Sequence, residues 1–89
     1  MEEQRTELYC GVGTSNKGYN ASLVEVETGE WNIKIAYGKH SGKLDSGGNL
    51  PDMGYKLNEN AGYYEAAVAY EKLIHAKLKK GYEITYQSE

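Results

Sequence analysis

The stretch WNIKIAYG at residues 31–38 decides the fold. Its large apolar side chains occupy every second position: Trp31, Ile33, Ile35 and Tyr37. A period of two is the spacing of a β-strand with one buried face. Residues 17–26 alternate as well, and a change of parity within them predicts a bulge or a twist partway along a second strand. Because the intervening residues 27–30 include Gly29 and have turn composition, the two strands are expected to pair as an antiparallel hairpin.

The region from Ala61 to Lys80 carries the pattern of a long helix. Its apolar residues recur three and four positions apart: Tyr63, Ala66, Ala67, Tyr70, Leu73, Ile74 and Leu78. This stripe predicts a helix with one buried face. The side chains of residues 58–60, Asn-Glu-Asn, are expected to cap its start, and Gly81 is expected to end it.

Three shorter segments complete the expected architecture. The sequence predicts a first strand at residues 5–10 and a short edge strand at residues 53–57. Residues 82–86 are predicted to form a last strand or an extended tail packed back on the sheet. The predicted fold is therefore α+β, a small antiparallel β-sheet with one long α-helix packed across one face. A chain of 89 residues accommodates a single domain, residues 1–89.

The composition is that of a globular domain, with 39% hydrophobic and 26% charged residues. There are nine Tyr and no Phe, so nearly every aromatic ring carries a hydroxyl that needs a partner, and the rings are expected at core edges or on the surface. Cys10 is the single cysteine, which excludes an intramolecular disulfide and predicts a small buried strand residue. No apolar run approaches the ~18 residues that cross a bilayer, so we expect a cytoplasmic protein without a membrane partner.

The sequence shows no pattern of an active site. His40 and His75 have no nucleophile at a recognisable spacing. The Gly-containing residues 11–18 are followed by Tyr19-Asn20, where a phosphate-binding P-loop requires Lys and then Ser or Thr. The carboxylates are scattered without the spacing of a calcium loop. We therefore expect no enzyme activity, no cofactor and no metal.

Charge is segregated along the chain. The net charge of -3 by itself disfavours a nucleic-acid partner. However, residues 31–43 hold three Lys, residues 72–82 hold four, and neither segment holds an acidic residue. Aromatic rings and His lie in both, and basic side chains among flat rings are what phosphate neutralisation and stacking require. In the alternative interpretation, the lysines at 77–80 complement a helix C-terminus, while Trp31 and Tyr37 line the core.

Three blocks in order resemble the WGR domain family. They are Asn16 to Leu23, then Tyr37-Gly38-Lys39, then the helix with Ala66, Tyr70, Leu73, Ile74, Lys77, Gly81 and Tyr82. The family carries an Asn-Lys-x-Tyr strand, a Trp-Gly-Arg triplet, and a helix with this spacing. The resemblance covers residues 16–82. It implies a small antiparallel sheet with one helix and, by similarity to the WGR domains of poly(ADP-ribose) polymerases, DNA binding near strand breaks.

By this resemblance Tyr37 takes the place of the triplet's Trp and Lys39 that of its Arg. Tyr offers less stacking area, and Lys cannot make the planar bidentate contacts of Arg. Ser41 also stands where the family usually has Gly.

The resulting hypothesis is a non-enzymatic module that binds nucleic acid, DNA above all, independently of sequence. Its expected contacts are Tyr37, Lys39, His40, Lys43, Lys17, Lys77, Lys79 and Lys80. The alternative hypothesis is a protein-interaction or regulatory module that uses a sheet edge and exposed Tyr, without nucleic acid. A single surface that joins the two lysine-rich segments favours the first hypothesis, whereas segments that point apart favour the second.

Overall fold

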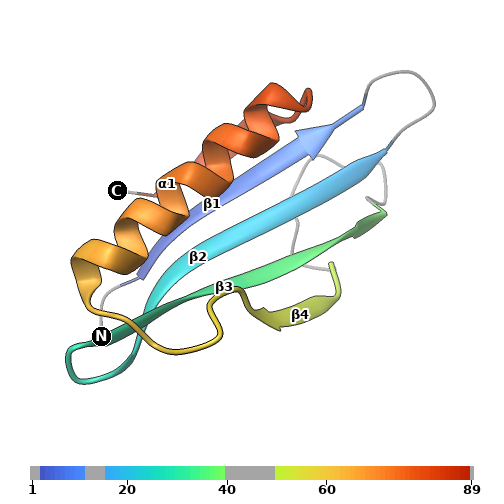
Figure 1. The fold of residues 1–89 in the computed structure, drawn as a ribbon. Helices are drawn as coiled ribbons and strands as arrows, with labels where there is room; N and C mark the ends of the chain where they lie inside the picture. Colours follow the sequence, from blue (N-terminus) through green and yellow to red (C-terminus); the bar gives the residue numbers. More distant parts are fainter. Residues whose placement is uncertain (1–2, 12–15, 40–49, 89) are drawn as a thin grey trace.

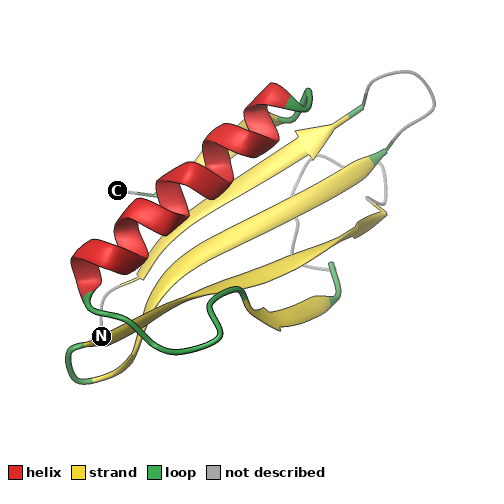
Figure 2. Ribbon diagram, viewed as in Figure 1, coloured by secondary structure: helices red, strands yellow, loops and turns green. Residues whose placement is uncertain are grey.

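A computed structural model describes residues 3–11, 16–39 and 50–88 of the chain (Figure 1). The strands and the helix are β1 (Glu3–Cys10), β2 (Lys17–Glu27), β3 (Glu30–Lys39), β4 (Asp52–Tyr55), α1 (Tyr63–Lys79) and β5 (Glu83–Gln87). The strands form one antiparallel sheet in the order β4-β3-β2-β1-β5. Figure 2 shows α1 lying along one face of this sheet. The predicted α+β architecture is confirmed.

The hairpin of β2 and β3 forms the centre of the sheet. Its register places Tyr19 opposite Tyr37 and Lys17 opposite Lys39. The two strands turn through Gly29, whose φ of 78° lies in the left-handed region that favours glycine. The expected irregularity in β2 is a register shift between Glu25 and Glu27, beside the turn rather than partway along the strand. The rest of the hairpin therefore keeps one side-chain face toward α1.

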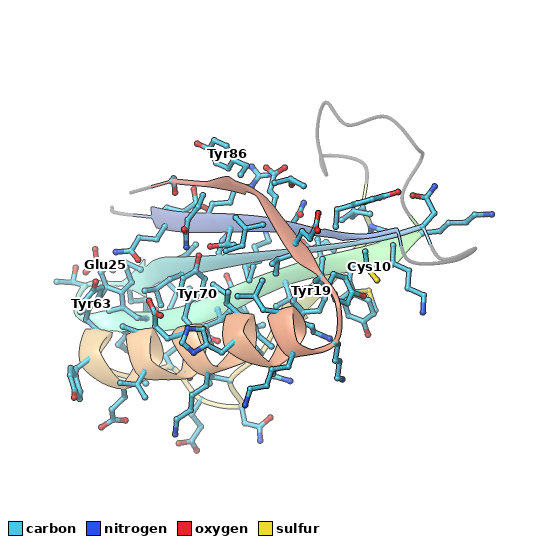
Figure 3. All side chains as sticks on the ribbon, turned by 90° about the horizontal axis from the view of Figure 1, so that it is seen from above. Cys10, Tyr19, Glu25, Tyr63, Tyr70 and Tyr86 are labelled. Carbon is cyan, nitrogen blue, oxygen red and sulfur yellow. The ribbon has the colours of Figure 1, made fainter. Side chains whose placement is uncertain are left out.

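The core lies between the sheet and α1. Its buried residues are Leu8, Tyr19, Ala21, Leu23, Trp31, Ile33, Ile35, Ala66, Tyr70 and Ile74. Two of its members, Tyr19 and Tyr70, are each 4% exposed, so the expectation that every Tyr ring lies at a core edge or on the surface is wrong for them (Figure 3). Tyr70 is buried because its hydroxyl is hydrogen-bonded to the Thr6 hydroxyl at 2.6 Å.

The start of α1 differs from the expectation. Its N-cap is Gly62, and no side chain caps the helix. The side chain of Asn60 instead accepts a hydrogen bond of 2.8 Å from the side chain of Asn32. Asn32 is 2% exposed and lies on β3, and its buried amide needs partners more than the exposed helix end does. The predicted cap in residues 58–60 is therefore wrong.

The end of α1 agrees with the expectation. Gly81 has a φ of 102°, and its N–H donates to the carbonyl of Leu78 at 3.1 Å. The N–H of Tyr82 donates to the carbonyl of Lys77 at 3.2 Å. These two bonds form a Schellman motif, which ends a helix and turns the chain back on its last residues.

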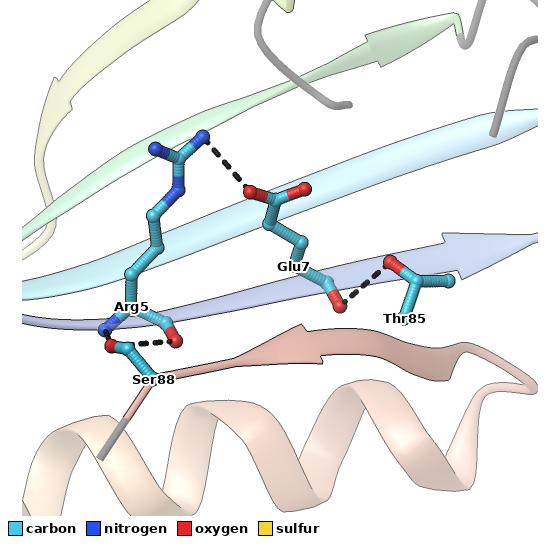
Figure 4. A network of polar contacts seen from close by, with 4 residues as sticks. All are labelled: Arg5, Glu7, Thr85 and Ser88. Atoms are coloured by element: carbon cyan, nitrogen blue, oxygen red, sulfur yellow. Dashed lines mark hydrogen bonds and ion pairs between the residues drawn. The ribbon is translucent and has the colours of Figure 1, made fainter. Parts of the chain in front are cut away.

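The last strand, β5, pairs with β1 at one edge of the sheet (Figure 4). The Ser88 hydroxyl accepts from the N–H of Arg5 at 2.7 Å, and the Thr85 hydroxyl donates to the carbonyl of Glu7 at 3.2 Å. Arg5 and Glu7 also form an ion pair of 3.1 Å. These contacts confirm the strand interpretation of this segment.

Two further expectations concern single features. Cys10 is a free, buried strand residue, as predicted. Across residues 3–11, 16–39 and 50–88, no helix has the length and apolar character that a membrane span requires.

Candidate nucleic-acid interface

A pocket of about 770 Å³ opens beside the C-terminal end of α1. It is lined by Asn16, Lys17, Gly18, Tyr19, Ile35, Tyr37, Gly38, Lys39, Lys56, Lys77 and Tyr82. Four of these residues are lysines, three are tyrosines, and none of the described lining residues is acidic. The pocket therefore combines positive charge with aromatic walls in a protein whose net charge is negative.

The β2–β3 hairpin supplies the floor of the pocket. Because residues directly opposite each other in an antiparallel pair point to the same face, Lys17 and Lys39 emerge side by side, and so do Tyr19 and Tyr37. Like charges at directly opposed positions destabilise a sheet. Residues that lower the stability of the fold are typical of functional sites. The Lys17–Lys39 pair therefore opposes the stability of the sheet, which makes this end of the hairpin a candidate site.

The tyrosine pair provides a stacking surface. The rings of Tyr19 and Tyr37 stack with centroids 5.4 Å apart and an interplanar angle of 13°. Tyr19 is buried, whereas Tyr37 is 42% exposed. Burial raises the pKa of Tyr19, and the neighbouring Tyr37 and Tyr82 raise it further. Tyr19 thus stays neutral and supports Tyr37, whose ring is accessible from the pocket.

The Schellman turn brings Lys77 and Tyr82 to the same pocket. The Lys77 ammonium lies 4.3 Å from the centroid of the Tyr19 ring and 5.7 Å from that of the Tyr82 ring. The rings of Tyr19 and Tyr82 meet edge to face, with centroids 6.4 Å apart. Burial lowers the pKa of Lys77, and the charges of Lys80 and Lys56 lower it further. The lysine is therefore held by two aromatic rings in a partly desolvated position.

Lys56 is a pocket residue that the sequence analysis did not identify. Its N–H donates to the carbonyl of Ile33 at 2.8 Å, which fixes it at the edge of β3 just after β4. The next residue, Leu57, is held by the side chain of Asn32, whose oxygen accepts from the Leu57 N–H at 3.1 Å. The one sequence signal is that Lys56 is the single basic residue in the acidic segment 44–71. That signal says nothing of its distance from the other lysines.

The predicted contacts divide into three groups. Four of them, Lys17, Tyr37, Lys39 and Lys77, are brought together in the pocket. Lys79 and Lys80 are exposed and do not line it. His40 and Lys43 lie outside the described residues. The two lysine-rich segments therefore meet through Lys39 and Lys77.

Other members of these segments lie elsewhere. Lys34 alternates with the pocket residues of β3, so it emerges on the opposite face of the sheet, where it pairs with Asp52 at 3.5 Å. Trp31 is buried, as the core interpretation predicts, and its ring meets that of Tyr63 edge to face. His75 lies 3.9 Å from Glu71 on an exposed part of α1.

Comparison with known proteins does not identify the site, so its function is inferred from the chemistry of its residues. No family model, curated protein or solved structure matches the chain. Among the residues that the structure describes, no three His, Cys, Asp or Glu side chains form a group that could hold a metal ion.

Proposed function

We propose that the protein is a non-enzymatic module that binds nucleic acid, DNA above all, independently of sequence. The observation that carries this proposal is the convergence of four lysines and an exposed tyrosine on one pocket without an acidic lining residue among those described. Phosphate neutralisation supplies most of the affinity in sequence-independent binding. Aromatic stacking adds to it without base readout, since every base has a flat face.

In the proposed mechanism the lysines and the tyrosine have separate roles. Lys17, Lys39 and Lys56 are exposed, and together with the half-buried Lys77 they neutralise the phosphates of the backbone. Tyr37 stacks on a base or sugar and is supported from behind by the buried ring of Tyr19. Because Lys is a point charge without the planar fork of Arg, the contacts position the backbone and do not read base edges.

The proposal extends to membership of the WGR family and to a location in the cytoplasm. The family resemblance is supported by an antiparallel sheet with one helix on one face, which is the fold that the resemblance implies. It is also supported by the position of Tyr37 and Lys39, because the residues in place of the triplet's Trp and Arg line the same pocket.

A fluorescence titration with labelled 5′-phosphorylated nicked duplex at low salt tests the proposal. The test variants are Tyr37→Ala and Lys39→Ala. The matched controls are Tyr64→Ala, which removes a ring that is 78% exposed at the other end of α1, and Lys34→Ala, on the same strand as Lys39 but on the opposite face. Each stacking ring is worth about 1–3 kcal/mol, so Tyr37→Ala is expected to weaken binding by about 5- to 150-fold.

The controls are expected to bind like the wild type. Absence of binding at tens of micromolar protein at low salt would refute the proposal. It would also fail if the test variants and the control variants lost the same affinity, because the pocket would then have no special role.

A protein-interaction module remains the second candidate, and the β5 edge supports it. All five residues of β5 are exposed, including Ile84 and Tyr86. An exposed edge strand offers unpaired backbone groups to another strand. Sedimentation of the wild type and of Ile84→Lys distinguishes this candidate, because self-association through β5 requires a dimer that the added charge dissociates. A monomer at all concentrations excludes self-association through this edge.

A further inference from the structure

Lys77 differs from the other lysines of the described chain in its surroundings. Its ammonium lies over the rings of Tyr19 and Tyr82, and it is half-buried, whereas Lys79 and Lys80 on the same turn are exposed. It nevertheless lines an open pocket, so a small reagent that enters the pocket reaches it. Lys17, Lys39 and Lys56 line the same pocket. These three exposed cations attract anions to the pocket that Lys77 also lines.

Burial and the neighbouring lysines favour the reactive, neutral form of this amine. A lysine acts as a nucleophile only when it is neutral, and desolvation and neighbouring cations both favour neutrality. The pKa of Lys77 is lowered, first by burial and then by Lys80 and Lys56. The pocket thus places a partly activated amine among three lysines that attract phosphate.

We propose that Lys77 is a modification site, acylated by small acyl phosphates that the pocket lysines hold through their phosphoryl group. The lone pair of the neutral Nζ attacks the acyl carbonyl, and a C–N bond forms. The bond from the carbonyl carbon to the phosphate oxygen breaks, and the phosphate leaves with the electron pair. The amine proton passes to water, so the products are an amide and inorganic phosphate.

The modification acts as a switch on the pocket, and this consequence rests on the proposed function. An amide at Lys77 carries no charge, so acylation removes one of the four cations and the cation–π contacts with Tyr19 and Tyr82. The loss of one phosphate contact lowers the magnitude of the salt slope of duplex binding by about 0.9. Acylation therefore weakens nucleic-acid binding and makes it less dependent on salt.

The experiment measures acylation of the full chain without nucleic acid, so that its outcome is independent of the proposed function. Acetyl phosphate is the probe, and mass spectrometry of peptides follows the initial rate at each lysine. Lys77 is expected to react several-fold faster than Lys72 or Lys79, which are exposed on the same helix. Inorganic phosphate is expected to slow the reaction at Lys77 and to leave the rate at Lys79 unchanged.

A second arm separates phosphate recruitment from amine reactivity. The double variant Lys17→Gln with Lys39→Gln is expected to lose the preference of acetyl phosphate for Lys77. The same double variant is expected to react still preferentially at Lys77 with the N-hydroxysuccinimide ester of acetic acid, which carries no charge. The control Lys34→Gln, on the other face of the sheet, is expected to keep both preferences. Circular dichroism verifies that each variant is folded.

Two results would overturn the inference. One is an equal rate of acetylation at Lys77 and Lys79 in the wild type. The other is a preference for Lys77 that neither inorganic phosphate nor the double variant reduces, because the phosphoryl group would then play no part.

Discussion

The hydrogen bond between Thr6 and Tyr70 joins β1 to α1 inside the core, and its removal has a predictable cost. The two hydroxyls lie 2.6 Å apart, Thr6 is 0% exposed and Tyr70 is 4% exposed. Thr6→Val replaces the hydroxyl with a methyl group and leaves the Tyr70 hydroxyl buried without this partner. Tyr70→Phe leaves the Thr6 hydroxyl with a longer contact of 3.4 Å from the side-chain amide of Gln87.

These differences give the three variants different expected stabilities. A buried polar group without a partner costs about 1–3 kcal/mol, so Thr6→Val should lower the free energy of unfolding by about 2 kcal/mol. Tyr70→Phe should cost about 1 kcal/mol, because the remaining hydroxyl keeps Gln87. The double variant removes both hydroxyls and leaves neither buried without a partner. Replacing both partners of a hydrogen bond by apolar groups can be nearly neutral, so the double variant should cost no more than about 1 kcal/mol. The coupling energy is then about -2 kcal/mol.

Urea unfolding followed by circular dichroism measures all four proteins, with the slope against urea as a check that unfolding remains two-state. In a domain of this size, 1 kcal/mol corresponds to about 4–8 °C in Tm, so Thr6→Val should unfold at a clearly lower temperature. Thr85→Val, whose exposed hydroxyl bonds a carbonyl at the sheet edge, serves as the control and should be nearly neutral. Additive single-variant costs, within about 0.5 kcal/mol, would refute the reasoning.

Four other predictions follow from the described geometry. Gly62→Ser adds the missing side-chain cap where the backbone is extended and nothing lies near the new side chain, so urea unfolding should show a gain of about 0.5–1 kcal/mol. Gly81→Ala puts a side chain at a φ of 102° and should cost about 1–2 kcal/mol, and it should weaken nucleic-acid binding because the turn positions Tyr82. Burial raises the pKa values of Tyr19 and Tyr70 above 10.0, so the folded chain binds these phenol protons more tightly than the unfolded chain does. Their contribution to stability is fully present below pH 10.0 and is lost as the pH rises through the folded-state pKa values, which urea unfolding as a function of pH measures. Four lysine contacts give a slope of log K against log salt of about -3.6 for duplex DNA, or an affinity loss of about 150-fold between about 50 and about 200 mM salt.

Each of these has a result that contradicts it. No stability gain in Gly62→Ser would mean that the N-terminus of α1 already satisfies its amides, and a neutral Gly81→Ala would mean that the turn relaxes without strain. A stability that stays constant through the titration of the tyrosines would contradict the role of burial. A salt slope near zero would exclude phosphate neutralisation as the source of affinity.

Much of the secondary structure was predictable because each element carries its own periodicity. The alternation in residues 31–38 and the stripe from Ala66 to Ile74 correspond to β3 and to the buried face of α1. The cap was not predictable from local chemistry. Asn60 has a suitable side chain for a cap, but the buried amide of Asn32, which is distant in sequence, takes that side chain as its own partner.

The candidate site was predictable in part. Tyr37 and Lys39 follow from a strand pattern combined with a local cluster of charge, and Lys77 follows from the basic end of a helix. The partner role of Tyr19 and the place of Lys56 were missed, because a single Lys in an acidic segment and one more Tyr in a strand are ordinary features of a sequence.

The amino-acid order alone predicts the two strands of the central hairpin, where the helix ends, and that net positive charge is confined to two segments, since each of these depends on neighbours within a few residues. Tertiary packing decides that β5 returns to pair with β1 and that Lys77 and Tyr82 meet the Lys17–Lys39 pair and the Tyr19–Tyr37 pair in one pocket. The reason is physical: α1 can bury Ala66, Tyr70 and Ile74 only by lying along the sheet, and that placement brings its C-terminal turn to the pocket end of the hairpin.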